Sequence, residues 1–239
     1  MSEEDAFLDG IAADRTDRTR LLVFADWLAD RSDPREEFVR LHAQLLEMDG
    51  TEPEFAGLER LWANWTGGVW TAQMPKLDDR WLDSMCRAFT AADVITYHAG
   101  APCVRSAEVE RHEYGQMDHM VTDGEETLVL YRGKPEAFDS PFAFTAGTVL
   151  RDLWDDPFRA AEAGAGNPGY RSLVPVVRGS FWQRWREYCA GLRNPPPLPA
   201  VAPDNHFLGA QYVEGDWNNW AVVAIHEHDY FALFWSTTA

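Results

Sequence analysis

The stretch RLLVFADWLADRSDPREEFVRL, residues 20–41, is the most regularly patterned part of this chain. Its first half places four apolar side chains at the spacing i, i+3, i+4 and i+7, which gathers them on one face of a helix. After a break, the apolar stripe resumes and continues to residue 48. The stretch therefore predicts two amphipathic helices, at about 18–30 and 34–48, joined by a tight turn. The apolar residues of the two stripes are Leu21, Phe24, Ala25 and Leu28, then Phe38, Leu41, Leu45 and Met48.

The turn between these two helices carries capping signals. Asp33 is a good N-cap, Pro34 suits the first helical turn, and Glu36 stands three residues after Asp33, which is the spacing of a capping box. Near the start of the chain, Ser2 is placed to cap a further helix at about 3–13. We therefore expect three short helices in this region.

Two segments of this region, FADWLADR (residues 24–31) and DPREEFVRL (residues 33–41), resemble the bacterial repeat-companion domain. That family is a small module at the N-terminus of otherwise dissimilar bacterial proteins, where it often precedes repeats. The resemblance covers about the first 48 residues, and no leucine-rich or similar repeat follows here. It implies a modular protein of the interaction type and carries no catalytic activity with it.

Asp26 lies between Ala25 and Trp27 on the first helix of the patterned stretch. Because a carboxylate close to an apolar core is usually paired, we expect a structural ion pair with a nearby arginine such as Arg40. The alternative is that Asp26 is a contact point for a partner.

Helical periodicity continues to about residue 90 and appears again later in the chain. A helix is expected at 53–65, with Leu61 on its apolar face, and another at 79–90, capped by Asp78. Two further helices are expected at 147–163 and after Ser180, which is placed as an N-cap.

Strand signals occupy the second half of the chain. Segments rich in β-branched and aromatic residues predict strands at 94–99 and 126–133, with a more polar strand between them at 104–115. The last segment, about 205–237, is expected to be an antiparallel meander. Its final strand, YFALFWST (residues 230–237), is apolar on both alternating faces, which predicts a central strand covered on both sides.

These elements together predict an α+β fold in two parts. The first part is a three-helix, repeat-companion-like module at residues 1–50. The second part, residues 51–239, is an α+β domain with helices packed on an antiparallel sheet that ends in the meander.

The composition limits the classes of partner. Asp and Glu number 39 against 21 Lys and Arg, so the formal net charge is −18. This charge argues against nucleic acid or an anionic membrane as a partner, since phosphate contacts need clustered cations. It favours another protein as the partner, one with a basic surface. The chain contains 11 Trp but no apolar run of membrane-spanning length. Three widely spaced cysteines and an acidic start predict a reduced, cytoplasmic protein.

The signals for catalysis are weak. The chain has no dinucleotide-binding, P-loop, nucleophile-elbow or H-E-x-x-H motif, so we expect no cofactor. His226 and His228, followed by Asp229, form a dense run of residues that can bind a metal, and two histidines at i, i+2 on a strand point the same way. The alternative is a solvated turn, because the run falls where the chain must reverse.

An aromatic group at one end of the meander is the other candidate site. Tyr212, Trp217 and Trp220 cluster near Asp216, and flat rings beside a carboxylate are typical of binding surfaces. Large side chains that close the end of a sheet produce the same pattern, and we favour that packing role.

Two hypotheses of function follow from different classes. The first is a non-enzymatic, acidic adaptor that binds other proteins, one version of which is an immunity-type inhibitor of a basic toxin. The second is a small metal-dependent hydrolase that uses His226, His228 and nearby carboxylates. The sequence favours the first.

Overall fold

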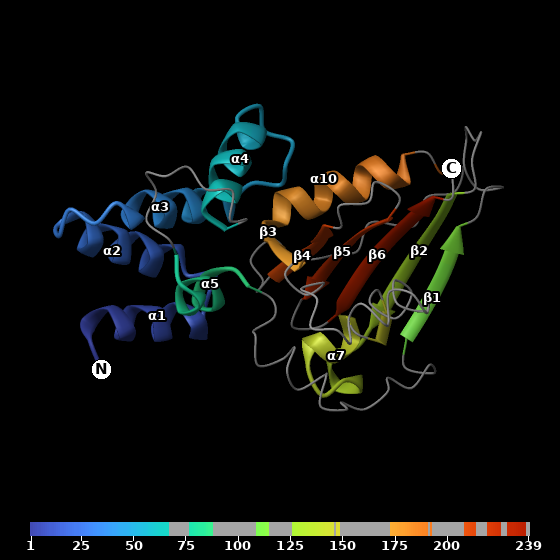
Figure 1. Ribbon diagram of the computed structural model, residues 1–239, viewed down its shortest axis with the longest axis horizontal. Helices are drawn as coiled ribbons and strands as arrows, with labels where there is room; N and C mark the ends of the chain where they lie inside the picture. Colours follow the sequence, from blue (N-terminus) through green and yellow to red (C-terminus); the bar gives the residue numbers. More distant parts are fainter. Residues whose placement is uncertain are drawn as a thin grey trace, which may run out of the picture.

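A computed structural model gives the fold of the chain, which is α+β. A group of helices at the N-terminus lies beside an antiparallel sheet with its own helices (Figure 1). The structure describes residues 1–66, 77–87, 109–114, 126–145, 147–148, 173–190, 192, 208–213, 219–225 and 229–237. The predicted strand at 94–99 lies outside these residues, and so does nearly all of the predicted helix at 147–163.

The three predicted N-terminal helices are present. They are α1 (Glu3–Ala13), α2 (Arg18–Ala29) and α3 (Arg35–Leu45). Ser2 caps α1 as expected, because its hydroxyl accepts a hydrogen bond from the Asp5 N–H at 3.0 Å and the Asp5 carboxylate accepts one from the Ser2 N–H at 2.8 Å. The apolar stripe of the sequence is therefore a true helical face, and α2 and α3 bury it against each other.

The predicted capping box at the start of α3 is wrong. The helix begins at Arg35, and Pro34 occupies the N-cap position without a side-chain hydrogen bond. Asp33 accepts hydrogen bonds from both the backbone N–H and the guanidinium of Arg35, each at 3.0 Å. Glu36 instead contacts Arg40 at 2.7 Å, one turn along the same helix. Glu36 thus binds a charged partner instead of the backbone N–H of Asp33 that a capping box would use, since charge-assisted hydrogen bonds are the stronger kind.

Two more helices share the core of the first three. They are α4 (Phe55–Thr66) and α5 (Asp79–Met85). Leu61, which was expected on the buried face of α4, is 48% exposed, so this assignment is wrong. The division of the chain at residue 50 stays a prediction, while the apolar core continues across that position. Buried residues that α4 and α5 add to it are Phe55, Trp62, Trp65, Trp81, Leu82 and Met85.

Helix α5 is shorter than the sequence predicts. Asp78 caps its start as expected, through a hydrogen bond of 3.0 Å from a backbone N–H of the first turn. At its end, the Arg15 guanidinium donates to the carbonyl oxygens of Asp83 (2.7 Å) and Ser84 (3.1 Å). These bonds satisfy carbonyl groups that a longer helix would have used, which explains why α5 stops at Met85.

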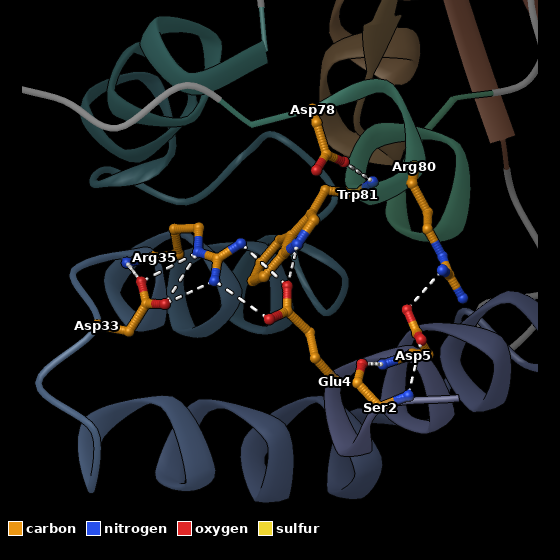
Figure 2. Close-up of polar contacts among 8 residues, drawn as sticks. All are labelled: Ser2, Glu4, Asp5, Asp33, Arg35, Asp78, Arg80 and Trp81. Carbon is orange, nitrogen blue, oxygen red and sulfur yellow. Dashed lines mark hydrogen bonds and ion pairs between the residues drawn. The ribbon is translucent and has the colours of Figure 1, made fainter.

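Polar side chains fix α5 against α1 and α3 (Figure 2). The Glu4 carboxylate accepts hydrogen bonds from the Trp81 indole N–H at 2.8 Å and from the Arg35 guanidinium at 3.0 Å. Arg35 also lies over the Trp81 ring, 4.3 Å from its centre. Asp5 and Arg80 form a second ion pair between α1 and α5. Three helices from distant parts of the sequence are thereby held in one arrangement.

The second part of the molecule is a six-stranded sheet in the order β1-β2-β6-β5-β4-β3, and every pairing is antiparallel. β4, β5 and β6 form the predicted meander, and β6 also pairs with β2, so it lies in the middle of the sheet as expected. The strands are β1 (Val109–Tyr114), β2 (Glu126–Gly133), β3 (Leu173–Val176), β4 (Leu208–Val213), β5 (Asn219–Ile225) and β6 (Tyr230–Thr237).

Helices cover both faces of β6. On one face, α10 (Arg178–Cys189) contributes Phe181 and Trp185 to a core that contains Leu233. On the other face, Phe144 of the short helix α7 (Pro141–Thr145) lies 5.5 Å from Tyr230 between ring centres. The prediction that residues 230–237 form a central strand covered on both sides is therefore confirmed.

Three smaller features complete the fold. A 3₁₀ turn, η3 (Pro135–Ala137), leads from β2 towards α7. Ser180 does not cap α10 as predicted, because it lies within the helix and Val177 is the N-cap residue. None of the helices in the described ranges is long and apolar enough to cross a membrane.

Candidate functional site

The structure places Tyr212 and Trp220 in different rows of the sheet. Tyr212 on β4 is the cross-strand partner of Ala221, whereas Trp220 on β5 is the partner of Val213 and Trp235. The aromatic group of Tyr212 and Trp220 stays a prediction. The other two members of that group, Asp216 and Trp217, lie outside the described residues.

The register shows what the Trp220 row contains instead. Trp220 pairs with Trp235, which pairs in turn with Leu128 of β2, and the row ends at Tyr114 of β1. Trp235 is partly buried, and its ring centre lies 5.6 Å from that of Tyr188 on α10. Trp235 thus belongs to the core beneath α10. Trp235 and Tyr188 were not among the predicted site residues.

The metal site proposed at His226 and His228 falls on residues that the structure does not describe, but Asp229 is described. Its carboxylate lies 3.1 Å from the Arg132 guanidinium and 2.7 Å from the Lys134 ammonium. Burial raises the pKa of Asp229, yet hydrogen bonds from these two cations outweigh it and leave the pKa below its usual value. Two cations on one carboxylate oppose the binding of a third. Across the described segments, no group of three potential ligands could hold a metal ion.

His42 is a buried histidine on α3 that the sequence analysis did not single out. Its ring lies between Phe38 and Trp62, at 5.9 and 6.0 Å between ring centres, and its Nδ1 accepts a hydrogen bond of 3.1 Å from the Trp62 indole. Burial lowers the pKa of His42 to about 4. The positive charge of Arg15 adds to this lowering, whereas the Met85 backbone carbonyl opposes it. No hydrogen bond of ordinary geometry reaches Nε2. His42 is therefore neutral near pH 7 and closed off from solvent.

The two described cysteines are equally unsuited to nucleophilic chemistry. Both are buried and free. Burial raises the pKa of Cys86 to about 12 and that of Cys189 to about 11. Because the thiolate is the reactive form, neither group is activated at neutral pH. Their role is to fill the two apolar cores.

The outer side of the α2–α3 pair carries the ion pair that the sequence predicted. Asp26 contacts Arg40 at 2.7 Å, and Arg40 also contacts Glu36 at 2.7 Å. The Asp26 side chain remains 70% exposed within this contact. The expected pairing is confirmed, and it lies at the surface rather than in the core.

Around this ion pair lies a surface that we call the α2–α3 face, made up of Val23, Asp26, Asp30, Glu36, Glu37 and Arg40. Val23, Asp26 and Asp30 follow one another at helical spacing along α2, and Glu37 precedes Arg40 by one turn on α3. Val23 is 51% exposed, which is unusual here for a large apolar residue. The face therefore combines four carboxylates and one guanidinium with an exposed apolar side chain.

The free charges of the described surface are nearly all negative. Among the Asp, Glu, Lys and Arg side chains that the structure describes, six carboxylates have no hydrogen bond or ion pair, whereas Arg60 is the one such cation. Two of the six, Asp30 and Glu37, lie on the α2–α3 face. The six are Asp30, Glu37, Glu54, Glu59, Glu136 and Asp139.

Comparison with known proteins adds no relative. No protein-family model, curated protein or solved structure matches the chain. The resemblance of residues 1–48 to the repeat-companion domain therefore stays a prediction.

Proposed function

We propose that this chain is a non-enzymatic protein-interaction protein and that its α2–α3 face binds a basic surface of another protein. The observation that carries the proposal is the imbalance of free charge. Most described cations are already held by carboxylates or carbonyl oxygens of the same chain, whereas several carboxylates are not. An incoming basic partner would thus meet carboxylates without having to displace an internal cation first.

The physical basis is electrostatic steering followed by close contact. A net charge of −18 attracts a cationic partner over a distance that salt screening sets at about 10 Å in 0.1 M salt. Once the partner is close, Val23 offers apolar area to bury, and the neighbouring carboxylates can accept hydrogen bonds from Lys or Arg. Such an interaction should weaken strongly as the salt concentration rises.

The buried titratable groups also favour binding over catalysis. A nucleophile or general base needs access to a substrate and a pKa matched to its task. His42, Cys86 and Cys189 have neither, because burial keeps each neutral and out of contact with solvent. The Asp229 carboxylate forms ion pairs with Arg132 on β2 and with Lys134, which directly follows β2.

The test uses a synthetic helical peptide with lysines on one face and leucines on the other, labelled with a fluorophore. Fluorescence anisotropy would measure its binding to the full chain at low and high salt. We expect binding that weakens as salt rises, and no binding of the same peptide with glutamate in place of lysine. Binding of both peptides with equal strength would contradict the charge argument, and so would binding of neither.

Two matched variants locate the contact. Asp30→Asn with Glu37→Gln removes two free charges from the α2–α3 face, whereas Glu136→Gln with Asp139→Asn removes two free charges outside it. Both variants have the same net charge. We expect the first to weaken peptide binding several-fold and the second to change it little. Equal weakening would show that total charge matters and that the face does not.

A further inference from the structure

Two glycines bring the helical region and the sheet region into direct backbone contact. Gly50 follows α3 and has φ of +88°, and a Cβ atom there would lie 2.5 Å from the carbonyl oxygen of Gly179. Gly179 is in the first turn of α10, and a Cβ atom there would lie 2.4 Å from the Phe55 ring and 2.9 Å from the Gly50 nitrogen. Neither position leaves room for a side chain, so the two backbones touch.

The turn at residues 49–52 is preformed for this contact. The Glu52 carboxylate accepts hydrogen bonds from the backbone N–H groups of Asp49 (3.1 Å) and Gly50 (3.0 Å). The Asp49 carboxylate accepts two more from Thr51, at 2.6 and 2.9 Å. From the other side, the Arg186 guanidinium of α10 donates to the Asp49 carbonyl oxygen at 2.9 Å. The turn is therefore held from within and tied to α10.

The first turn of α10 also belongs to both apolar cores. Val177, its N-cap residue, is buried in the core of the helical region. Phe181, one turn later, is fully buried in the core beneath the sheet. One short segment thus contributes to two cores that would otherwise be separate.

We propose that the contact between the 49–52 turn and the first turn of α10 is a latch that makes the helical region and the sheet one cooperative unit. The helical region then cannot unfold without exposing Val177 and releasing the end of α10. By linkage, a ligand that binds the helical region also stabilises the sheet. This inference does not depend on the proposed function, because it requires no partner.

The test is a urea titration of the full chain, followed by pulse-labelling hydrogen exchange and mass spectrometry. Peptides from α2–α3 and from β5–β6 report the two regions separately. In the natural protein we expect one urea midpoint for both sets of peptides. In Gly179→Ala the new methyl group must push the turn away, because two of its nearest neighbours are a packed ring and a backbone nitrogen. We expect two midpoints in that variant.

Gly57→Ala is the matched control. Gly57 lies on α4, and a Cβ atom there meets nothing within 4 Å, so the two regions should still unfold together. Arg186→Met is a milder variant that keeps the chain foldable if Gly179→Ala is too disruptive, and it should also separate the midpoints. Two midpoints in the natural protein would overturn the latch. A single shared midpoint in both Arg186→Met and a folded Gly179→Ala would overturn it as well.

Discussion

The helical region and the sheet region differ in how their tryptophans are hydrogen-bonded. In the helical region, the indole N–H groups of Trp27, Trp62 and Trp81 donate to Glu3, His42 and Glu4 respectively. In the core beneath the sheet, the indole nitrogen of Trp185 is buried and has no hydrogen-bond partner. Both regions are rich in aromatic residues, but of these four tryptophans the three in the helical region act as polar anchors and Trp185 does not.

This difference follows from how each kind of element is held in place. A helix satisfies its own backbone groups, so neighbouring helices are positioned by side chains alone. A strand is positioned by its backbone ladder, and here five antiparallel pairings fix six strands. The sheet can therefore leave a buried N–H of a packed helix unpaired, while the helical region depends on specific polar contacts such as those of Glu4.

The largest effect should come from acid, through the buried His42 of the helical region. The pKa of His42 is about 4 in the folded chain, against about 6.5 for an unfolded histidine. The unfolded state therefore binds the extra proton below pH 6.5, and stability falls until about pH 4, by about 3 kcal/mol. Urea unfolding at pH 7 and pH 4 would measure this loss. His42→Gln should lose less stability over the same interval, and an equal loss would contradict the assignment.

A glycine of the sheet region should give the next largest effect. A Cβ atom on Gly133 would lie 2.5 Å from the Phe138 ring and 3.1 Å from the Phe144 ring. Gly133→Ala should therefore cost about 1–3 kcal/mol, through overpacking of a filled core. The measurement is the urea midpoint against that of Gly57→Ala, whose new methyl group meets nothing within 4 Å. Equal midpoints would show that this end of the sheet is loosely packed.

A pair of tryptophan substitutions tests the comparison directly. Trp81→Phe removes an indole that donates to Glu4 and stacks with Arg35, whereas Trp185→Phe removes an indole with no hydrogen-bond partner. Both changes reduce volume equally. We expect Trp81→Phe to be more destabilising by about 1.5 kcal/mol, the lower end for a hydrogen bond to a charged group, because the Glu4 carboxylate is partly exposed. Thermal unfolding of both variants would measure the difference, and the reverse order would contradict our account of the two regions.

The smallest effect should come from the surface of the α2–α3 face. Arg40→Gln breaks the contacts with Asp26 and Glu36, but the Arg40 side chain is 43% exposed. Exposed ion pairs contribute about 0–1 kcal/mol, so the thermal midpoint should hardly move. The same variant should bind the basic peptide more tightly, because it removes the one cation of the face. A large loss of stability would mean that this ion pair is a structural element of the helical region.

Elements with a strong period were predictable from the sequence. The stripe through Phe24, Leu28 and Phe38 gave the first helices, and the alternation of residues 230–237 gave a central strand. The start of α3 was not predictable, because Arg35 is held by Glu4, a residue 31 positions away in the chain. Local capping signals at Asp33 and Glu36 could not reveal that contact.

The candidate site was less predictable than the fold. Composition indicated an acidic surface, and the pairing of Asp26 with Arg40 followed from the usual pairing of charges near a core. The relation between Tyr212 and Trp220 depends on strand register, and a shift of one residue moves a strand's side chains to the other face. Nothing in the sequence distinguished buried His42 from the other six histidines.

The place of β6 in the sheet has a consequence for how the chain is made. β6 joins β2 to β5, and β2 ends at Gly133, whereas β6 begins at Tyr230. During synthesis the two halves of the sheet cannot meet until residues 230–237 have left the ribosome, while the helices of the first 87 residues make mostly local contacts. The β6-facing edge of the apolar strand β2 therefore stays unpaired in the nascent chain from the time Gly133 emerges until Tyr230–Thr237 follows. A chaperone that recognises extended apolar segments would find its binding sites there, and release would await the final strand.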